Sequence, residues 1–182
     1  MGTRTQVKNL IHCIVIVSHS FSIHSHSFSI HAGNIWLGDD DGLILIDYGQ
    51  VKQFTPSERL KLAKMILAVC SNDSDLIVKE FRSLGFETKR NDPWVIERSA
   101  RFFFEDDSNP LLQTRRDGSQ MNLQKVMEYL NDEDPTVRFP ESYFFAIRTA
   151  MLLRGLASHL GVGINVAHAW KKHAERAVNE LQ

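Results

Sequence analysis

The sequence predicts a mostly helical domain with one small β-hairpin near its N-terminus, an α+β fold. Two observations carry this prediction. Residues 34–48 hold two short apolar runs on either side of a turn-forming GDDDG stretch. Beyond Gln53, apolar residues recur at helical spacing between residues that typically begin and end helices. A chain of 182 residues, 43% of them hydrophobic, can bury a sizeable core without disulfides.

The first thirty residues differ from the rest of the chain. The hexapeptide HSFSIH occurs at 19–24 and again at 26–31. A histidine-rich tract can bind metal, but the first 38 residues contain no Asp or Glu that would complete a ligand set. We therefore expect residues 1–30 to be a Ser/His-rich leader that is disordered or non-native. Five of the eight histidines lie in or directly after it: His12, His19, His24, His26 and His31.

The hairpin follows directly. NIWL and LILI are its strands, and because LILI is apolar at consecutive positions, we expect it to be buried on both faces. The acidic run Asp39–Asp41 lacks the rest of a calcium-loop signature, so it is interpreted as the turn.

Two helices are predicted next. Thr55, Pro56 and Glu58 form a capping-box pattern at the start of the first helix. A second helix begins near Ser74 and ends at Gly85. The inward stripes expected are Leu60, Ala63, Leu67 and Cys70 on the first helix, and Ile77, Phe81 and Leu84 on the second.

Four more helical segments are predicted in the C-terminal half. Asp92-Pro93 begins one through WVIERSARFFF, and Asn122 caps the next. Pro140 opens a long, nearly apolar helix that we expect to be central to the core. Gly161 stops it, and Asn165 begins the last helix. The polar segment 105–121 is the predicted loop. The inward residues of the helix after Asn122 are Leu123, Val126, Met127 and Leu130.

Charge and cysteine content exclude several classes of partner. The net charge of -1 gives no basic footprint for nucleic acid or anionic lipid. The longest apolar run near the N-terminus, residues 10–17, is far too short for a transmembrane segment. Two cysteines, Cys13 and Cys70, have neither a disulfide framework nor a metal-binding spacing, so a reducing compartment is expected.

The two ends of the hairpin carry the candidate site. Asn34 stands at its entrance and Asp47 at its exit, so antiparallel strands bring both to the same open end. Amide and carboxylate oxygens suit magnesium, which is usually completed by water and substrate phosphates. The sequence therefore predicts Asn34 and Asp47 as metal-binding and cofactor-binding residues.

The stretch HAGNIWL…GLILIDYGQVKQFTPSERLKLAKMILAV resembles the UbiB/ADCK family of atypical protein-kinase-like proteins, whose members read approximately DPHPGNI…LIDFGQVKQL. The continuation Gln50-Val51-Lys52 is the most discriminating part. The resemblance covers residues 31–182 and implies the C-terminal lobe of a protein-kinase-like fold, with the N-lobe missing. It also implies ATP and Mg²⁺ as cofactors, held through Asn34 and Asp47.

The same resemblance implies that phosphoryl transfer is lost. The aspartate of the family's DPHPGN motif falls on Ser29, and a serine cannot accept the acceptor's proton as a carboxylate does. The KxGQ element of the family is absent, and residues 1–33 leave no room for an N-lobe. No catalytic residue is therefore assigned, and nucleotide binding is expected to be weak or absent. For intact members, the resemblance implies ATP-dependent support of quinone-lipid biosynthesis in mitochondria, plastids or bacteria.

Two other functions stay open. One is a non-catalytic helical interaction module that binds a protein partner through the surface an N-lobe would cover. The other is a small-molecule phosphotransferase of the aminoglycoside or choline kinase type. Phe102–Phe104 with Trp94 are interpreted as core rather than as a lipid or quinone pocket. His159, His168 and His173 are interpreted as surface or helix-end residues.

Overall fold

A computed structural model describes residues 26–29, 35–38, 43–45, 50–105, 109–159 and 161–182. The described chain is mostly helical and carries small two-stranded antiparallel sheets, which confirms the predicted fold class. The strands are β1 (His26–Ser29), β2 (Ile35–Leu37), β3 (Leu43–Leu45), β4 (Gln50–Gln53), β5 (Glu87–Thr88) and β6 (Thr136–Arg138). The α-helices are α2 (Pro56–Ser71), α3 (Ser74–Ser83), α4 (Pro93–Phe104), α5 (Val126–Glu133), α6 (Phe144–His159) and α7 (Val166–Leu181).

Most helix boundaries fall where the sequence predicts them. Thr55, Asp92 and Asn165 each accept a backbone N–H at the start of α2, α4 and α7. Gly85 and Gly161 take left-handed backbone angles after α3 and α6, which a side chain at either position would oppose. Asn122 caps the short 3₁₀ turn Leu123–Lys125, which leads directly into α5. The predicted loop contains a second 3₁₀ turn, Pro110–Gln113, anchored by buried Leu112.

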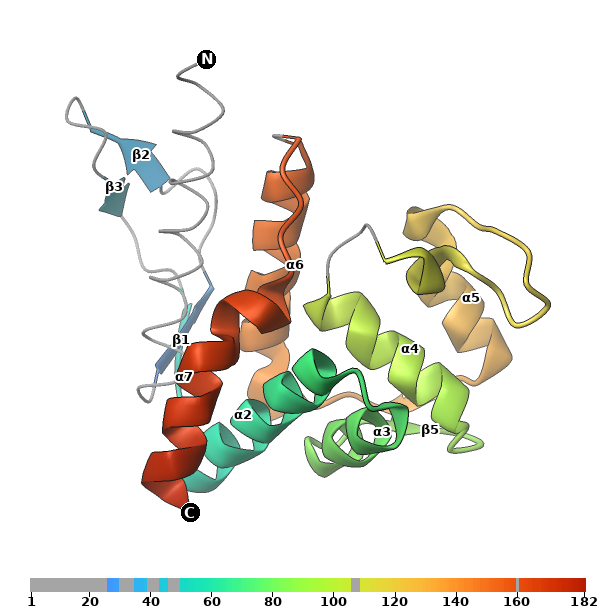
Figure 1. Ribbon diagram of the computed structural model, residues 1–182, viewed down its shortest axis with the longest axis horizontal. Helices are drawn as coiled ribbons and strands as arrows, with labels where there is room; N and C mark the ends of the chain where they lie inside the picture. The colour runs from blue at the N-terminus through green and yellow to red at the C-terminus, as the bar shows by residue number, and fades with distance from the viewer. Residues whose placement is uncertain (1–25, 30–34, 39–42, 46–49, 106–108, 160) are drawn as a thin grey trace.

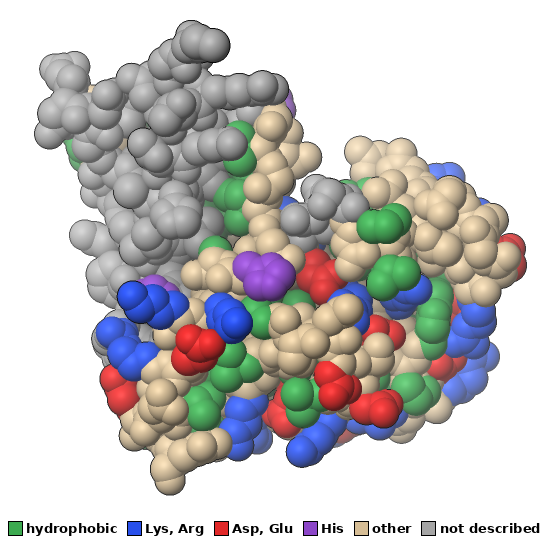
Figure 2. Space-filling view, in the orientation of Figure 1, with side chains coloured by type: hydrophobic (Ala, Val, Ile, Leu, Met, Phe, Trp, Pro, Cys, Tyr) green, Lys and Arg blue, Asp and Glu red, His purple; other side chains and the backbone are tan. Residues whose placement is uncertain are grey.

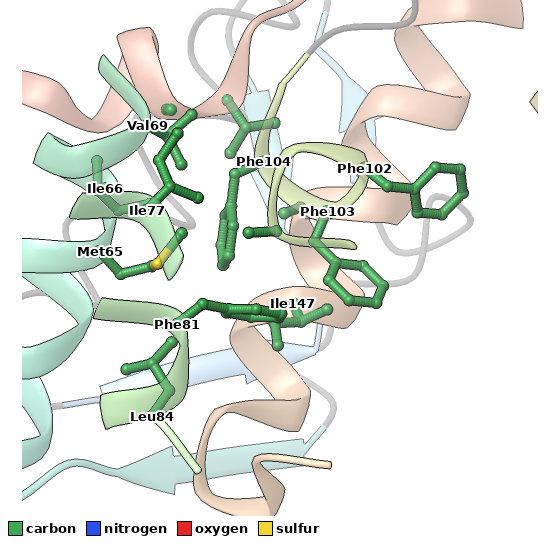
Figure 3. Packing of buried hydrophobic residues seen from close by; sticks show 14 of the residues in the cluster. Met65, Ile66, Val69, Ile77, Phe81, Leu84, Phe102, Phe103, Phe104 and Ile147 are labelled. Carbon is green, nitrogen blue, oxygen red and sulfur yellow. The ribbon is translucent and has the colours of Figure 1, made fainter. Parts of the chain in front are cut away.

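The core lies where α2, α3, α4 and α6 meet (Figure 3). Phe81 of α3 stacks on Phe86, with 4.5 Å between ring centroids, and tilts against Phe103 of α4 at 6.1 Å. Phe102, Phe103 and Phe104 are all buried, which confirms their interpretation as core. On the other side of α2, α7 packs along the helix and forms its most extensive contact (Figure 1).

The expected inward stripe of α2 is only partly right: Ala63 is buried, and Leu67 and Cys70 pack against the edge of the core. Leu60, Leu67 and Cys70 are only half-buried. The buried residues are Leu62, Ala63, Met65, Ile66, Ala68 and Val69. This helix contacts α7, α3 and α4 at once, so neighbours on several sides decide which residues are buried. A single-stripe pattern describes a helix with one buried face, and α2 has more than one.

One further expectation is wrong, and another holds for one side of its helix. The strand LILI is not buried on both faces, because Ile44 in β3 is 49% exposed. Among the described strands β3 pairs with β2 alone, and Trp36 and Ile44 of this ribbon are both exposed. The helix after Pro140 begins as a 3₁₀ turn, Glu141–Tyr143, and continues as α6. One side of α6 lies in the core, as expected, but Phe144, Met151 and Leu152 are exposed along the other side. The buried apolar residues of α6 are Ala146, Ile147, Ala150, Leu153 and Ala157.

The capping box at the start of α2 gives a direct stability prediction. Glu58 N–H donates to Thr55 Oγ1 over 3.2 Å, and Thr55 N–H donates back to Glu58 Oε2 over 2.8 Å. The variant Thr55→Ala is expected to lower the free energy of unfolding by about 1 kcal/mol. Urea denaturation measures this, with Ser57→Ala in the same exposed turn as the control. Equal effects of the two substitutions would contradict a capping role for Thr55.

Candidate functional site

The strands around the candidate site pair in a nested order. β1 pairs antiparallel with β4, and β2 pairs antiparallel with β3 between them in the chain. The innermost partners of the outer pair are Ser29 and Gln50, and Ile35 and Leu45 are partners in the inner pair. Segment 30–34 therefore connects Ser29 to Ile35 in the chain, and segment 46–49 connects Leu45 to Gln50.

The predicted ligands belong to these two connecting segments. Asn34 directly precedes Ile35, and Asp47 follows Leu45 by two positions, and both lie outside the described residues. Ser29, which the resemblance aligns with an aspartate, is the last residue of β1 and pairs with Gln50. The turn interpretation of Asp39–Asp41 also lies outside the described residues.

β1 falls within the predicted leader. The remainder of residues 1–30 is outside the described part of the chain, so the leader prediction stays untested.

An ion pair fixes β4 to the helical body. Lys52 Nζ of β4 lies 3.7 Å from Glu58 Oε1 in the first turn of α2. Burial raises the pKa of Glu58, but hydrogen bonds from Thr55 and Ser142 and the charge of Lys52 outweigh it, so this pKa lies below its usual value. Tyr143 adds a link from the turn before α6, donating its hydroxyl to the Glu58 carbonyl over 3.3 Å. The segment that follows residue 49 is thus tied to the start of α2.

Sequence reasoning missed this role of Glu58. The capping box can be predicted from the spacing of Thr55 and Glu58. The contact with Lys52 depends on the angle between β4 and α2, which no local sequence pattern predicts. The family-like Gln50-Val51-Lys52 continuation was the available signal, because it places a cation at the end of β4.

The described residues offer no other site of the predicted kind. Within the described ranges, no three His, Cys, Asp or Glu side chains gather as metal ligands. His159 and His168 are exposed and His173 is half-buried, which agrees with surface and helix-end roles. Cys70 is half-buried, and burial raises the pKa of its thiol to about 11, so it is protonated at neutral pH.

Surface charge agrees with the composition. On the face shown in Figure 2, Lys and Arg side chains alternate with Asp and Glu and form no large patch of one sign. Among the helices that the structure describes, none has the length and apolar character needed to cross a membrane.

Comparison with known proteins identifies relatives of this chain. Residues 4–81 match the ABC1 atypical kinase-like domain, a region that includes β1 to β4, α2 and most of α3. An uncharacterized protein of Synechocystis sp. is 24% identical over 136 residues, which cover 73% of this chain and 22% of that protein. Protein ACTIVITY OF BC1 COMPLEX KINASE 7, chloroplastic, of Arabidopsis thaliana is 23% identical over 126 residues, 68% of this chain and 17% of that protein.

The chain thus spans about a fifth of the length of these curated relatives. No solved structure matches it at a significant level.

Proposed function

Because residues 4–81 are related to the ABC1 atypical kinase-like domain, we propose that the nested strands form the magnesium-binding part of a kinase-like nucleotide site, with Asn34 and Asp47 as the ligands. The observation that carries the proposal is the strand register. Segments 30–34 and 46–49 join the same two pairs of partners, Ser29 with Gln50 and Ile35 with Leu45. The described residues that flank Asn34 and Asp47 in the chain are thus strand partners.

The donor set fits the ion. Asn34 offers an amide oxygen and Asp47 a carboxylate, and magnesium is usually bound by one or two carboxylates, waters and substrate phosphates. When bound, the ion would neutralise charge on the nucleotide phosphates. The protein's own part is to hold the two oxygens, and the ion pair of Lys52 with Glu58 supports this by anchoring the strand that follows Asp47.

Titration with a fluorescent ATP analogue tests the site on the full chain. We expect weak binding that requires Mg²⁺, is removed by chelation, and falls at least about tenfold in Asp47→Asn and in Asn34→Ala. The matched control is Asp40→Asn, a carboxylate in the predicted turn of the same hairpin. Binding that is indifferent to Mg²⁺, or equally sensitive to Asp40→Asn, would disprove the assignment.

We also propose that this chain binds nucleotide without transferring its phosphoryl group. The reason is Ser29, whose neutral hydroxyl cannot take up a proton as the family's aspartate does. Phosphate release from Mg-ATP should therefore be no faster for the wild-type chain than for Asp47→Asn. A wild-type rate clearly above that background would show that the chain is catalytic.

The family match favours this function over a phosphotransferase of the aminoglycoside or choline kinase type. The name of the Arabidopsis relative supports a plastid location for the present protein, which subcellular fractionation with an antibody would test. The quinone-lipid link implied by the resemblance stays a prediction. A second candidate, the helical interaction module, is favoured by the exposed apolar side of α6.

A further inference from the structure

One side of α6 is exposed along the whole helix. The exposed positions are Phe144, Arg148, Met151, Leu152, Gly155, Ser158 and His159. At 3.6 residues per turn these positions form one continuous stripe, because they recur at spacings of three and four. Phe144 is 48% exposed and Leu152 40%, an unusual exposure for large apolar side chains on one side of a helix.

A groove runs along this stripe. Phe103 of α4 and Phe139, which precedes the 3₁₀ turn at 141–143, form one wall. Ile147, Met151 and Leu152 of α6 lie on the other side, and the cavity between them has a volume of about 490 Å³. The lining is apolar apart from Arg148. The groove therefore fits the apolar side chains of a segment lying along α6.

Gly155 gives independent support for the close approach of another helix to α6. Glycine weakens a helix interior, and α6 continues for a full turn beyond it. A Cβ built at Gly155 would meet no atom within 4 Å, so no neighbour in the fold requires glycine here. A bare backbone on an exposed apolar stripe allows another helix to cross at close range.

The charge of the stripe indicates which kind of partner this surface can bind. Arg148 lies on the groove and pairs with no carboxylate among the described residues. The exposed stripe of α6 contains no Asp or Glu. A second copy of α6 crossing antiparallel at Met151 and Leu152 would bring another arginine and no acid. Charge complementarity therefore disfavours a second copy and favours a partner that supplies a carboxylate.

We propose that the exposed side of α6, from Phe144 to Gly155, is a docking surface for an amphipathic helix of a protein partner. The partner helix places apolar side chains against Phe144, Met151 and Leu152, crosses α6 at Gly155, and carries an acidic residue that pairs with Arg148. α6 also packs against β1 and β4, but the docking proposal does not depend on nucleotide binding.

Three synthetic peptides of sixteen residues, the length of α6, test the proposal. They share one leucine stripe and differ only in carrying Glu, Gln or Lys beside it. Fluorescence anisotropy on the full chain should show the Glu peptide binding at least about tenfold more tightly than the Lys peptide. Arg148→Glu should invert that order. Lys172→Glu, an exposed charge change on α7, should leave it unchanged.

Gly155→Leu supplies a variant that keeps its fold, because the space around this residue is open. It should weaken all three peptides at least about tenfold by blocking the helix crossing. Asp47→Asn should leave peptide binding intact, which separates failure of this proposal from failure of the nucleotide site. Equal affinity of the three peptides, or undiminished binding to Gly155→Leu, would overturn the proposal.

Two other binding partners of this surface, a second copy of the chain and a lipid membrane, would each give a different experimental result. A dimer in light scattering that dissociates in Gly155→Leu would identify a second copy as the occupant. Flotation with phosphatidylcholine vesicles that is lost in Gly155→Leu would identify a lipid surface. Either result overturns the protein-helix proposal.

Discussion

Replacing Phe81 by alanine is expected to lower the free energy of unfolding by about 4 kcal/mol. Phe81 of α3 is 0% exposed, stacked on Phe86 and tilted against Phe103 of α4. The substitution removes the apolar area of a full ring and leaves a cavity that packed neighbours fill only in part, so both the transfer and the cavity costs apply. Urea denaturation followed by far-UV circular dichroism measures the loss.

The chain offers a matched control for Phe81. Phe144→Ala removes the same side chain from the surface of α6, where it is 48% exposed. That change should cost less than about 1 kcal/mol. Comparable losses at the two positions would mean that Phe81 is not the centre of the helical core.

Replacing Asp134 by alanine is expected to destabilise the protein by a similar amount, about 4 kcal/mol, for an electrostatic reason. Asp134 follows α5 and is 0% exposed. Its carboxylate accepts the Thr88 hydroxyl over 2.6 Å, the backbone N–H of Arg90 over 2.8 Å and that of Asp92 over 3.0 Å. Alanine leaves these donors without their acceptor and frees the turn that leads into α4.

The pH dependence provides a second measurement of Asp134. Burial raises the pKa of its carboxyl, but the hydrogen bonds from Thr88, Asp92 and Arg90 outweigh that effect and bring the pKa below the usual value. The stabilisation is therefore present above the unfolded pKa of about 3.9 and is lost as pH falls through the lower folded pKa. The loss of stability between pH 5 and pH 2 should be smaller in Asp134→Ala than in the wild type.

Asp132→Ala, two residues earlier and exposed on α5, is the control for both measurements. It should leave stability and its pH dependence near the wild-type values. A wild-type stability that changes with pH no more than that of Asp134→Ala would contradict a charged, hydrogen-bonded Asp134.

The buried arginines show where sequence patterns reach their limit. Arg101 is 2% exposed and pairs with Glu97 and Glu105 on its own helix, at spacings of four residues. Arg154 of α6 is also buried and donates to the Glu105 carbonyl over 3.1 Å, with its guanidinium 4.9 Å from the centre of the Phe102 ring. The spacing predicts that Arg101 can pair, but not that it is buried. Burial depends on α6 reaching the end of α4, which is a tertiary contact.

The candidate site also has a part that the sequence predicts and a part that it does not. The spacing of Asn34, Asp47 and Ser29 could be found from the sequence because the motif is local and resembles a family pattern. The pairing of β1 with β4 was not predicted. The sequences HSFS and QVKQ show little alternation of apolar and polar residues. Their pairing as strands therefore depends on the residues between them in the chain.

The sequence by itself determined the helices, their caps and the hairpin, because propensity, capping and turn chemistry act within a few residues of each position. Tertiary structure alone decided which sides of α2 and α6 are buried, that β1 closes on β4, and that Asp134 collects three donors from the turn before α4. The physical reason is that an apolar helix has several sides able to pack, and a polar group several possible partners. Only the neighbours brought by the rest of the chain select among them.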